Sequence, residues 1–203
     1  GRRHALPYEP GIDRPGGASG EDPHREGTPR QDLLAALSFL DSVDTIIPDG
    51  ERDRFEQLRE LVRSADDGHG LPEVLFYGNF LHAPDHAILT ARGPVAINWK
   101  ASGYGPRLAD FAYLLWGTGS WNPRRANHEW IDATVAAYRA HVQLTDAELD
   151  RLEAVMYSRT LYLTCFGYRR AATSRRAFKE WGSIEPAEYY TATAAAARAA
   201  FTS

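Results

Sequence analysis

The stretch FYGNFLHAPDHAILTARGPVAINWKASGYGPRLADFAYLLW, from Phe76 to Trp116, carries most of the information about the fold. The segment EVLFY, which overlaps its beginning, is typical of a short strand. AILT and VAINW then flank the turn sequence ARGP, which predicts a β-hairpin. After GYGP, apolar residues recur at helical spacing, and Pro106 can begin that helix. The stretch therefore predicts a strand, a loop, a hairpin and a helix in that order.

Helical periodicity dominates the chain on both sides of this stretch. The segments predicted as helices cover about residues 30–43, 51–65, 127–142 and 186–201, with a long helix that opens at the capping box Thr145–Glu148. Residues 1–29 are dense in Pro and Gly and show no period, which indicates an irregular arm. The fold class expected is mainly α with a small β-hairpin insert (α+β), as one domain over residues 30–203 after that arm.

Composition excludes several classes of function. The chain has 203 residues and a net charge of −4, which gives no reason to expect nucleic acid or an anionic membrane as partner. Cys165 is the only cysteine, so no internal disulfide is expected and a reducing compartment fits best. No apolar run approaches a membrane span, and the first residues lack a signal-peptide core. A cytoplasmic location is therefore expected.

A set of framework residues surrounds the predicted hairpin. They are, in chain order, Gly78, Phe80, Pro84, Ile97, Trp99, Gly103, Gly105, Pro106, Arg107 and Asp110. In this order the chain, over roughly residues 30–172, resembles the C-terminal lobe of the aminoglycoside phosphotransferase and choline kinase-like family. The resemblance implies a protein-kinase-like C-lobe, in which a strand ends in the catalytic loop and a hairpin delivers a metal-binding turn.

The resemblance places amides where the family has its two carboxylates. Asn79 stands at the position of the catalytic Asp, after Tyr77 where the family has His, and Asn98 stands at the metal-binding position. Asp85 and His86 fall near the family's loop Asn. An amide cannot accept a proton and brings no charge, whereas Mg²⁺ usually binds through carboxylates and phosphate oxygens. We therefore expect a catalytically degenerate chain without a cofactor, with Mg-ATP bound only if the phosphotransferase alternative below holds.

The residues before the catalytic loop also depart from a complete kinase. The family has a β-rich N-lobe with a lysine that pairs with the phosphates. Here no lysine precedes Lys100, and no Gly-rich phosphate loop precedes Tyr77. The N-lobe is expected to be truncated away, supplied by another chain or absent by design. Any of these would leave apolar interlobe surface exposed, and such surface usually marks a binding face.

The function that the resemblance suggests is that of a pseudokinase-like protein, a binding or regulatory partner of another enzyme in resistance or natural-product biosynthesis. Its partner would be a protein that covers the interlobe face, or a second copy of the chain in a homodimer. One alternative is an ATP-dependent phosphotransferase that acts on a small-molecule hydroxyl with altered residues. A second alternative is repurposed chemistry, with Tyr77, His82, Asp85 and His86 as acid or base groups.

Two smaller groups complete the candidate sites. Trp99, Tyr104 and Asp110 are candidates for a groove that holds a small-molecule ligand, because aromatic faces suit flat or cationic molecules. His82, Asp85 and His86 resemble a Zn²⁺ ligand set, but Pro84 interrupts the helix that would align them. No metal site is therefore predicted.

Overall fold

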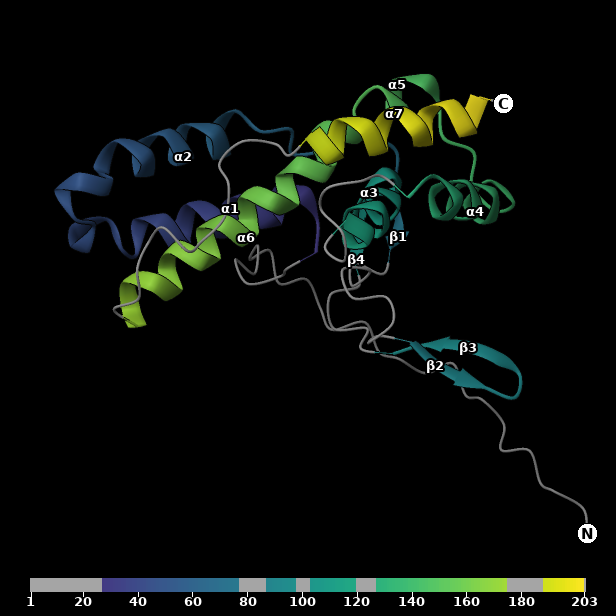
Figure 1. Ribbon diagram of the computed structural model, residues 1–203, viewed down its shortest axis with the longest axis horizontal. Coiled ribbons are helices and arrows are strands. Elements are labelled where there is room, and N and C mark those ends of the chain that lie inside the picture. The colour runs from purple at the N-terminus through teal and green to yellow at the C-terminus, as the bar shows by residue number, and fades with distance from the viewer. Residues whose placement is uncertain (1–26, 77–86, 98–102, 120–126, 175–187, 203) are drawn as a thin grey trace, which may run out of the picture.

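The computed structural model describes residues 27–76, 87–97, 103–119, 127–174 and 188–202. These residues are mainly helical, with two small antiparallel two-stranded sheets (Figure 1). The helices are α1 (Pro29–Asp41), α2 (Arg52–Ser64), α3 (Arg107–Gly119), α4 (His128–Arg139), α5 (Asp146–Leu149), α6 (Leu152–Ser174) and α7 (Glu188–Thr202). The strands are β1 (Glu73–Phe76), β2 (Ala87–Thr90), β3 (Gly93–Ala96) and β4 (Gly103–Pro106). The mainly helical α+β prediction is confirmed at this level.

The predicted helices over residues 30–43 and 51–65 are confirmed as α1 and α2. Thr28 caps α1, since its Oγ1 accepts a hydrogen bond from the Gln31 N–H at 3.1 Å and Pro29 occupies the first turn. In α2 the buried residues Phe55, Leu58 and Val62 recur at helical spacing, as the sequence pattern indicated.

Helix α6 joins two hydrophobic clusters. Its first half contributes Leu152 and Met156 to a cluster with α3, α4, α5 and α7. Its second half contributes Leu161 and Tyr168 to a cluster with α1 and α2. Because one long helix belongs to both clusters, it connects the two groups of helices that Figure 1 shows at either end of the helical body.

The β1–β4 pair corrects the sequence-based prediction for GYGP. Residues Gly103–Pro106 form a strand that was not predicted, and α3 begins at Arg107, one residue after the predicted start. Pro106 lies opposite Glu73, and the Arg107 N–H continues the ladder to the Pro72 carbonyl at 2.9 Å. A segment with two glycines and a proline has low strand propensity, so only its non-local partner makes it a strand.

The predicted hairpin is confirmed as β2 and β3, with a shorter turn than expected. Thr90 lies opposite Gly93, so Ala91 and Arg92 alone form the turn. Gly93 has a φ of 109°, a conformation that favours glycine, and its carbonyl accepts a hydrogen bond from Thr90 Oγ1 at 2.7 Å. The second strand therefore starts earlier than VAINW.

The C-terminal helices follow the sequence with one interruption. Both bonds of the capping box between Thr145 and Glu148 are present, but this box opens the short α5 and not one long helix. The Arg151 N–H bonds to Glu148 O, three residues back, so the α-helical ladder tightens before α6 begins. The bounds of helices α4 and α7 lie within about three residues of those predicted.

Candidate functional site

Most of the predicted site residues lie outside the described part of the chain. These residues are Tyr77, Asn79, Asp85, His86, Asn98 and Trp99, together with His82. The strands that flank them are described. Phe76 lies opposite Gly103, and Ala87 lies opposite Ala96. In the sequence, segment 77–86 therefore connects β1 to β2, and segment 98–102 lies between β3 and β4.

The other two predicted groove residues lie on separate elements. Tyr104 lies on β4 opposite Leu75 and is 75% exposed. Asp110 lies in the first turn of α3 and is half-buried. Burial is the main cause that raises the pKa of Tyr138, and the negative charge of Asp110 adds to it. The charge of Asp110 therefore acts on the phenol group of Tyr138.

Exposed apolar side chains mark both two-stranded sheets. We call this set the sheet surface; it comprises Leu75, Ile88, Leu89, Val95 and Tyr104. Leu89 is 84% exposed and Leu75 is 67% exposed, and Figure 1 shows the β2–β3 hairpin standing away from the helices. The sequence offered a signal for this surface, because AILT and VAIN are apolar on consecutive residues and so on both strand faces.

The hairpin carries apolar residues on both of its faces. Ile88 lies opposite Val95, while Leu89 lies opposite Pro94 on the other face, because successive strand residues point to opposite sides. A two-stranded hairpin is marginally stable alone in water. Both faces of this hairpin therefore expose apolar side chains.

Arg107, one of the framework residues, forms an ion pair with Glu148. Arg107 donates from Nε and Nη2 to the two carboxylate oxygens of Glu148, both at 2.6 Å. Glu148 is buried and also accepts from the Thr145 backbone and hydroxyl. Burial opposes ionisation of Glu148, but these hydrogen bonds outweigh it and lower its pKa. Arg107 therefore fixes the start of α3 to α5.

A second ion pair lies at the α5–α6 junction. Arg151 donates to both oxygens of Asp66, at 2.7 Å from Nε and 2.5 Å from Nη2, and to the His69 carbonyl at 2.9 Å. The hydrogen bonds from Arg151 lower the pKa of Asp66. The loop between α2 and β1 is thereby bound to the junction between α5 and α6.

A third ion pair, which is buried, joins α1, α3 and α6. Arg159 Nη1 donates to Asp32 Oδ2 at 2.7 Å, and the Tyr113 hydroxyl donates to the same oxygen at 3.1 Å. Gly27 N–H reaches the other carboxylate oxygen at 3.4 Å. Burial raises the pKa of Asp32, and the Arg159 charge opposes that effect. This cluster was not predicted from the sequence, although the arginine within the apolar segment AVMYSRTLYL was a signal for it.

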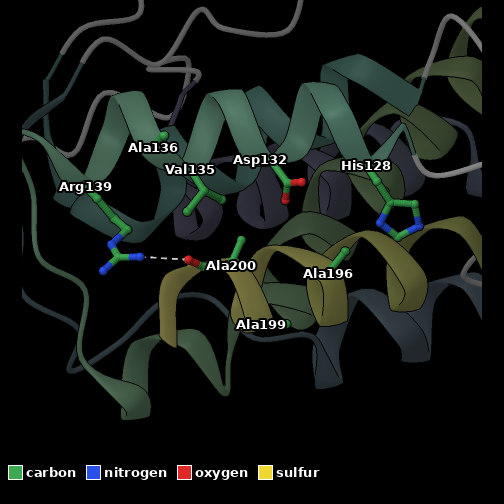
Figure 2. A pocket seen from close by; sticks show the side chains of 8 residues that line it. All are labelled: His128, Asp132, Val135, Ala136, Arg139, Ala196, Ala199 and Ala200. Atoms are coloured by element: carbon green, nitrogen blue, oxygen red, sulfur yellow. Dashed lines mark hydrogen bonds between the residues drawn. The ribbon is translucent and has the colours of Figure 1, made fainter. Parts of the chain in front are cut away.

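A groove of about 560 Å³ lies between α4 and α7, and Figure 2 shows the side chains that line it. The α4 side chains His128, Asp132 and Arg139 line one wall, and α7 contributes Ala196, Ala199 and Ala200. Arg139 Nη1 donates to the Ala200 carbonyl at 2.8 Å, so this arginine caps the end of α7. None of the candidate residues from the sequence lines this groove.

The described residues hold no group of three or more His, Cys, Asp or Glu side chains that could bind a metal ion.

Cys165 is buried in the α1–α2–α6 cluster, and burial raises the pKa of its thiol, as expected for a small apolar core residue. In the same described ranges no helix is both long enough and apolar enough to cross a membrane.

Comparison with known proteins identifies no relative: no protein-family model, no curated protein and no solved structure matches this chain.

Proposed function

We propose that the chain is a catalytically degenerate, kinase-like C-lobe related to the aminoglycoside phosphotransferases and choline kinases. In this proposal it acts as a binding or regulatory partner of another enzyme, and the sheet surface is where the partner binds. The proposal requires two things of the chain: loss of the phosphate and metal chemistry, and a surface suited to a partner.

Support for the kinase-like arrangement comes from the strand pairing. Asn79 is the third residue after Phe76 at the end of β1, and Asn98 is the second residue after Ala96 at the end of β3. Both amide positions therefore follow strands directly, as the catalytic-loop and metal-binding positions do in the family that the sequence resembles. The arginine of Gly-Pro-Arg-x-x-Asp is bound to Glu148, which is a structural use of the motif.

Support for lost activity comes from the residue types at these positions. Phosphoryl transfer depends on positioning and on neutralising phosphate charge through bound metal ions. Asn98 offers a neutral carbonyl oxygen to a metal where a carboxylate would bind Mg²⁺, and Asn79 cannot accept the proton of an acceptor hydroxyl. Weak or absent binding of Mg-ATP is the direct consequence.

The sheet surface is the observation that carries the proposal. Leu75 and Tyr104 lie opposite each other and are both exposed, and the β2–β3 hairpin is apolar on both faces. Exposed apolar side chains are typical of protein–protein binding sites where they form a patch. Their position beside the amide-substituted segments suggests that the old interlobe face now serves for binding.

Calorimetric titration with ATP, with and without Mg²⁺, tests the loss of activity. We expect no saturable binding below ~1 mM in either condition, which corresponds to less than about 4 kcal/mol of binding free energy. The double variant Asn79→Asp, Asn98→Asp is the matched comparison and should restore Mg²⁺-dependent binding if only the carboxylates are missing. Submillimolar, Mg²⁺-dependent binding by the unmodified chain would contradict the proposal and favour an active phosphotransferase.

Light scattering of the purified chain then identifies the kind of partner. If the chain is dimeric and Leu89→Glu makes it monomeric, the sheet surface binds a second copy. If the unmodified chain and the Leu89→Glu variant are both monomeric, the partner is a different protein. A dimer that Leu89→Glu leaves intact would place self-association elsewhere on the molecule.

A further inference from the structure

The side of α4 that borders the groove against α7 carries one acidic and one basic residue, with two short apolar residues between them. We call this set the α4 stripe; it comprises Asp132, Val135, Ala136 and Arg139. Successive members are three, one and three positions apart, which is the spacing of residues on a single helix face. Figure 2 shows Asp132 near the middle of the groove and Arg139 toward one end.

The opposite wall of the groove is formed by alanines. Ala196, Ala199 and Ala200 of α7 line it, and each of these side chains ends at a methyl group. The distance at which two helices pack depends on the size of the side chains between them, so alanines allow another helix to approach closely. The groove is therefore shaped to accept a helix from outside.

Both charged members of the α4 stripe can bind a partner. Asp132 is exposed and, within the described ranges, takes part in no ion pair. Arg139 is half-buried and uses Nη1 for its bond to the Ala200 carbonyl. A guanidinium has five N–H donors, so this bond leaves others for a carboxylate. The stripe thus presents a carboxylate and a guanidinium about 10.5 Å apart along the helix axis.

We propose that the α4 stripe and the groove bind a second copy of the chain, with the two α4 helices antiparallel across a two-fold axis. If the axis passes at the level of Val135 and Ala136, Asp132 of each copy lies level with Arg139 of the other. Two ion pairs then form together, because a two-fold interface repeats each of its contacts. This site goes beyond the function proposed above, since Figure 1 shows α4 and α7 apart from the β2–β3 hairpin.

Charge complementarity favours a second copy over an unrelated helix. Asp132 lies three positions before Val135, and Arg139 lies three positions after Ala136. The stripe is therefore symmetric about its centre, with opposite charges at its two ends. An antiparallel copy is attracted at both ends of the stripe, whereas a parallel copy would place like charges together.

Sedimentation of the purified chain over a range of concentrations tests the proposal. We expect a monomer–dimer equilibrium with a dissociation constant below about 100 µM. Ala136→Glu places two carboxylates close together at the axis and should weaken the dimer by about tenfold or more. Ala133→Glu is the matched control, because Ala133 is exposed on α4 but does not line the groove, and it should leave the dimer unchanged. Leu89→Glu on the hairpin should also leave it unchanged.

Exchanging the charges of the α4 stripe gives a sharper test. Asp132→Arg leaves two arginines on the stripe and Arg139→Asp leaves two aspartates, so each variant alone should be monomeric. An equimolar mixture of the two should form a heterodimer, because each arginine of one chain then faces an aspartate of the other. Mixing does not restore the bond from Arg139 to the Ala200 carbonyl, so a recovered dimer reports on charge pairing alone. Thermal melts establish that each variant is folded.

Three results would overturn the proposal. The first is a chain that stays monomeric up to about 100 µM. The second is a dimer that Ala136→Glu leaves intact or that Ala133→Glu weakens equally; if Leu89→Glu dissociates that dimer, the sheet surface is the contact between copies. The third is a mixture of the two charge variants that stays monomeric although both are folded.

Discussion

Arg159 and Asp32 are 127 positions apart in the sequence, and their ion pair joins α6 to α1 inside the molecule. The Arg159 guanidinium also stacks over Tyr162, 4.6 Å from the ring centre. Removing one partner of a buried pair leaves the other charge without compensation, which costs far more than the pair itself contributes. The same reasoning does not hold for the exposed pair between Arg198 and Asp150.

Arg159→Ala should therefore lower the free energy of unfolding by about 3–5 kcal/mol. Arg198→Ala is the control and should cost at most about 1 kcal/mol, because its pair is exposed to water. Urea denaturation of both variants measures the difference. A loss below about 1 kcal/mol for Arg159→Ala would show that Asp32 finds other compensation, such as a proton.

At the scale of elements, the short strand β4 depends on close packing with the loop before β1. Gly68 has a φ of 79°, and a Cβ added there would lie 2.7 Å from Cγ of Pro106. Gly70, with a φ of 77°, has no heavy atom within 4 Å of the same position. The two glycines share a backbone conformation and differ in contacts.

Gly68→Ala and Gly70→Ala form a matched pair. The backbone conformation alone should cost about 1–2 kcal/mol in each variant. Gly68→Ala should cost about 1–3 kcal/mol more, because the new methyl group overlaps the Pro106 ring. Urea denaturation gives both values. Equal losses would mean that the loop moves away from β4 without cost.

The β2–β3 hairpin yields a prediction about exposed apolar surface. Leu89→Glu should reduce the fluorescence of a bound apolar dye and change stability by no more than about 0.5 kcal/mol, because this side chain is 84% exposed. Leu34→Glu is the control, since Leu34 is 50% exposed on α1, outside the sheet surface. Equal dye loss in both variants would argue against a dye-binding site on the hairpin.

For the whole molecule, the ion pairs of Glu148 and Asp66 connect stability to pH. Both carboxylates have lowered pKa values in the folded state, so they contribute stability above their unfolded pKa values, near pH 4. That contribution is lost as pH falls through the folded pKa values. The fold should therefore lose stability in acid through groups on both sides of the α5–α6 junction.

The double variant Asp66→Asn, Glu148→Gln should flatten this acid dependence. We expect lower stability at pH 7, by about 2–4 kcal/mol, and a smaller further loss between about pH 5 and pH 3 than in the unmodified chain. Thermal unfolding across this range measures both effects. Asp146→Asn, at an exposed first-turn carboxylate of α5, is the control and should retain the original slope.

Much of the helical architecture could be predicted, whereas the candidate site could be predicted only in part. Thr145 marks a helix start through local capping and is found where the sequence placed it. Leu75 and Leu89 were predicted to lie in strands. Their exposure could not be predicted, because it depends on which other elements cover the sheets. The predicted catalytic-loop positions, Asn79 among them, lie outside the described residues, so their roles remain predictions.

The sequence by itself determined the helices, the β2–β3 hairpin and the buried helix faces, because these follow from caps, turns and periodicity within a few neighbouring residues. Only the tertiary structure decided that Gly103–Pro106 form a strand, that Arg159 pairs with Asp32, and that Arg107 binds Glu148. Each of these contacts joins residues more than 25 positions apart. The free energy of such contacts comes from burial and charge pairing that exist only once the helices have packed.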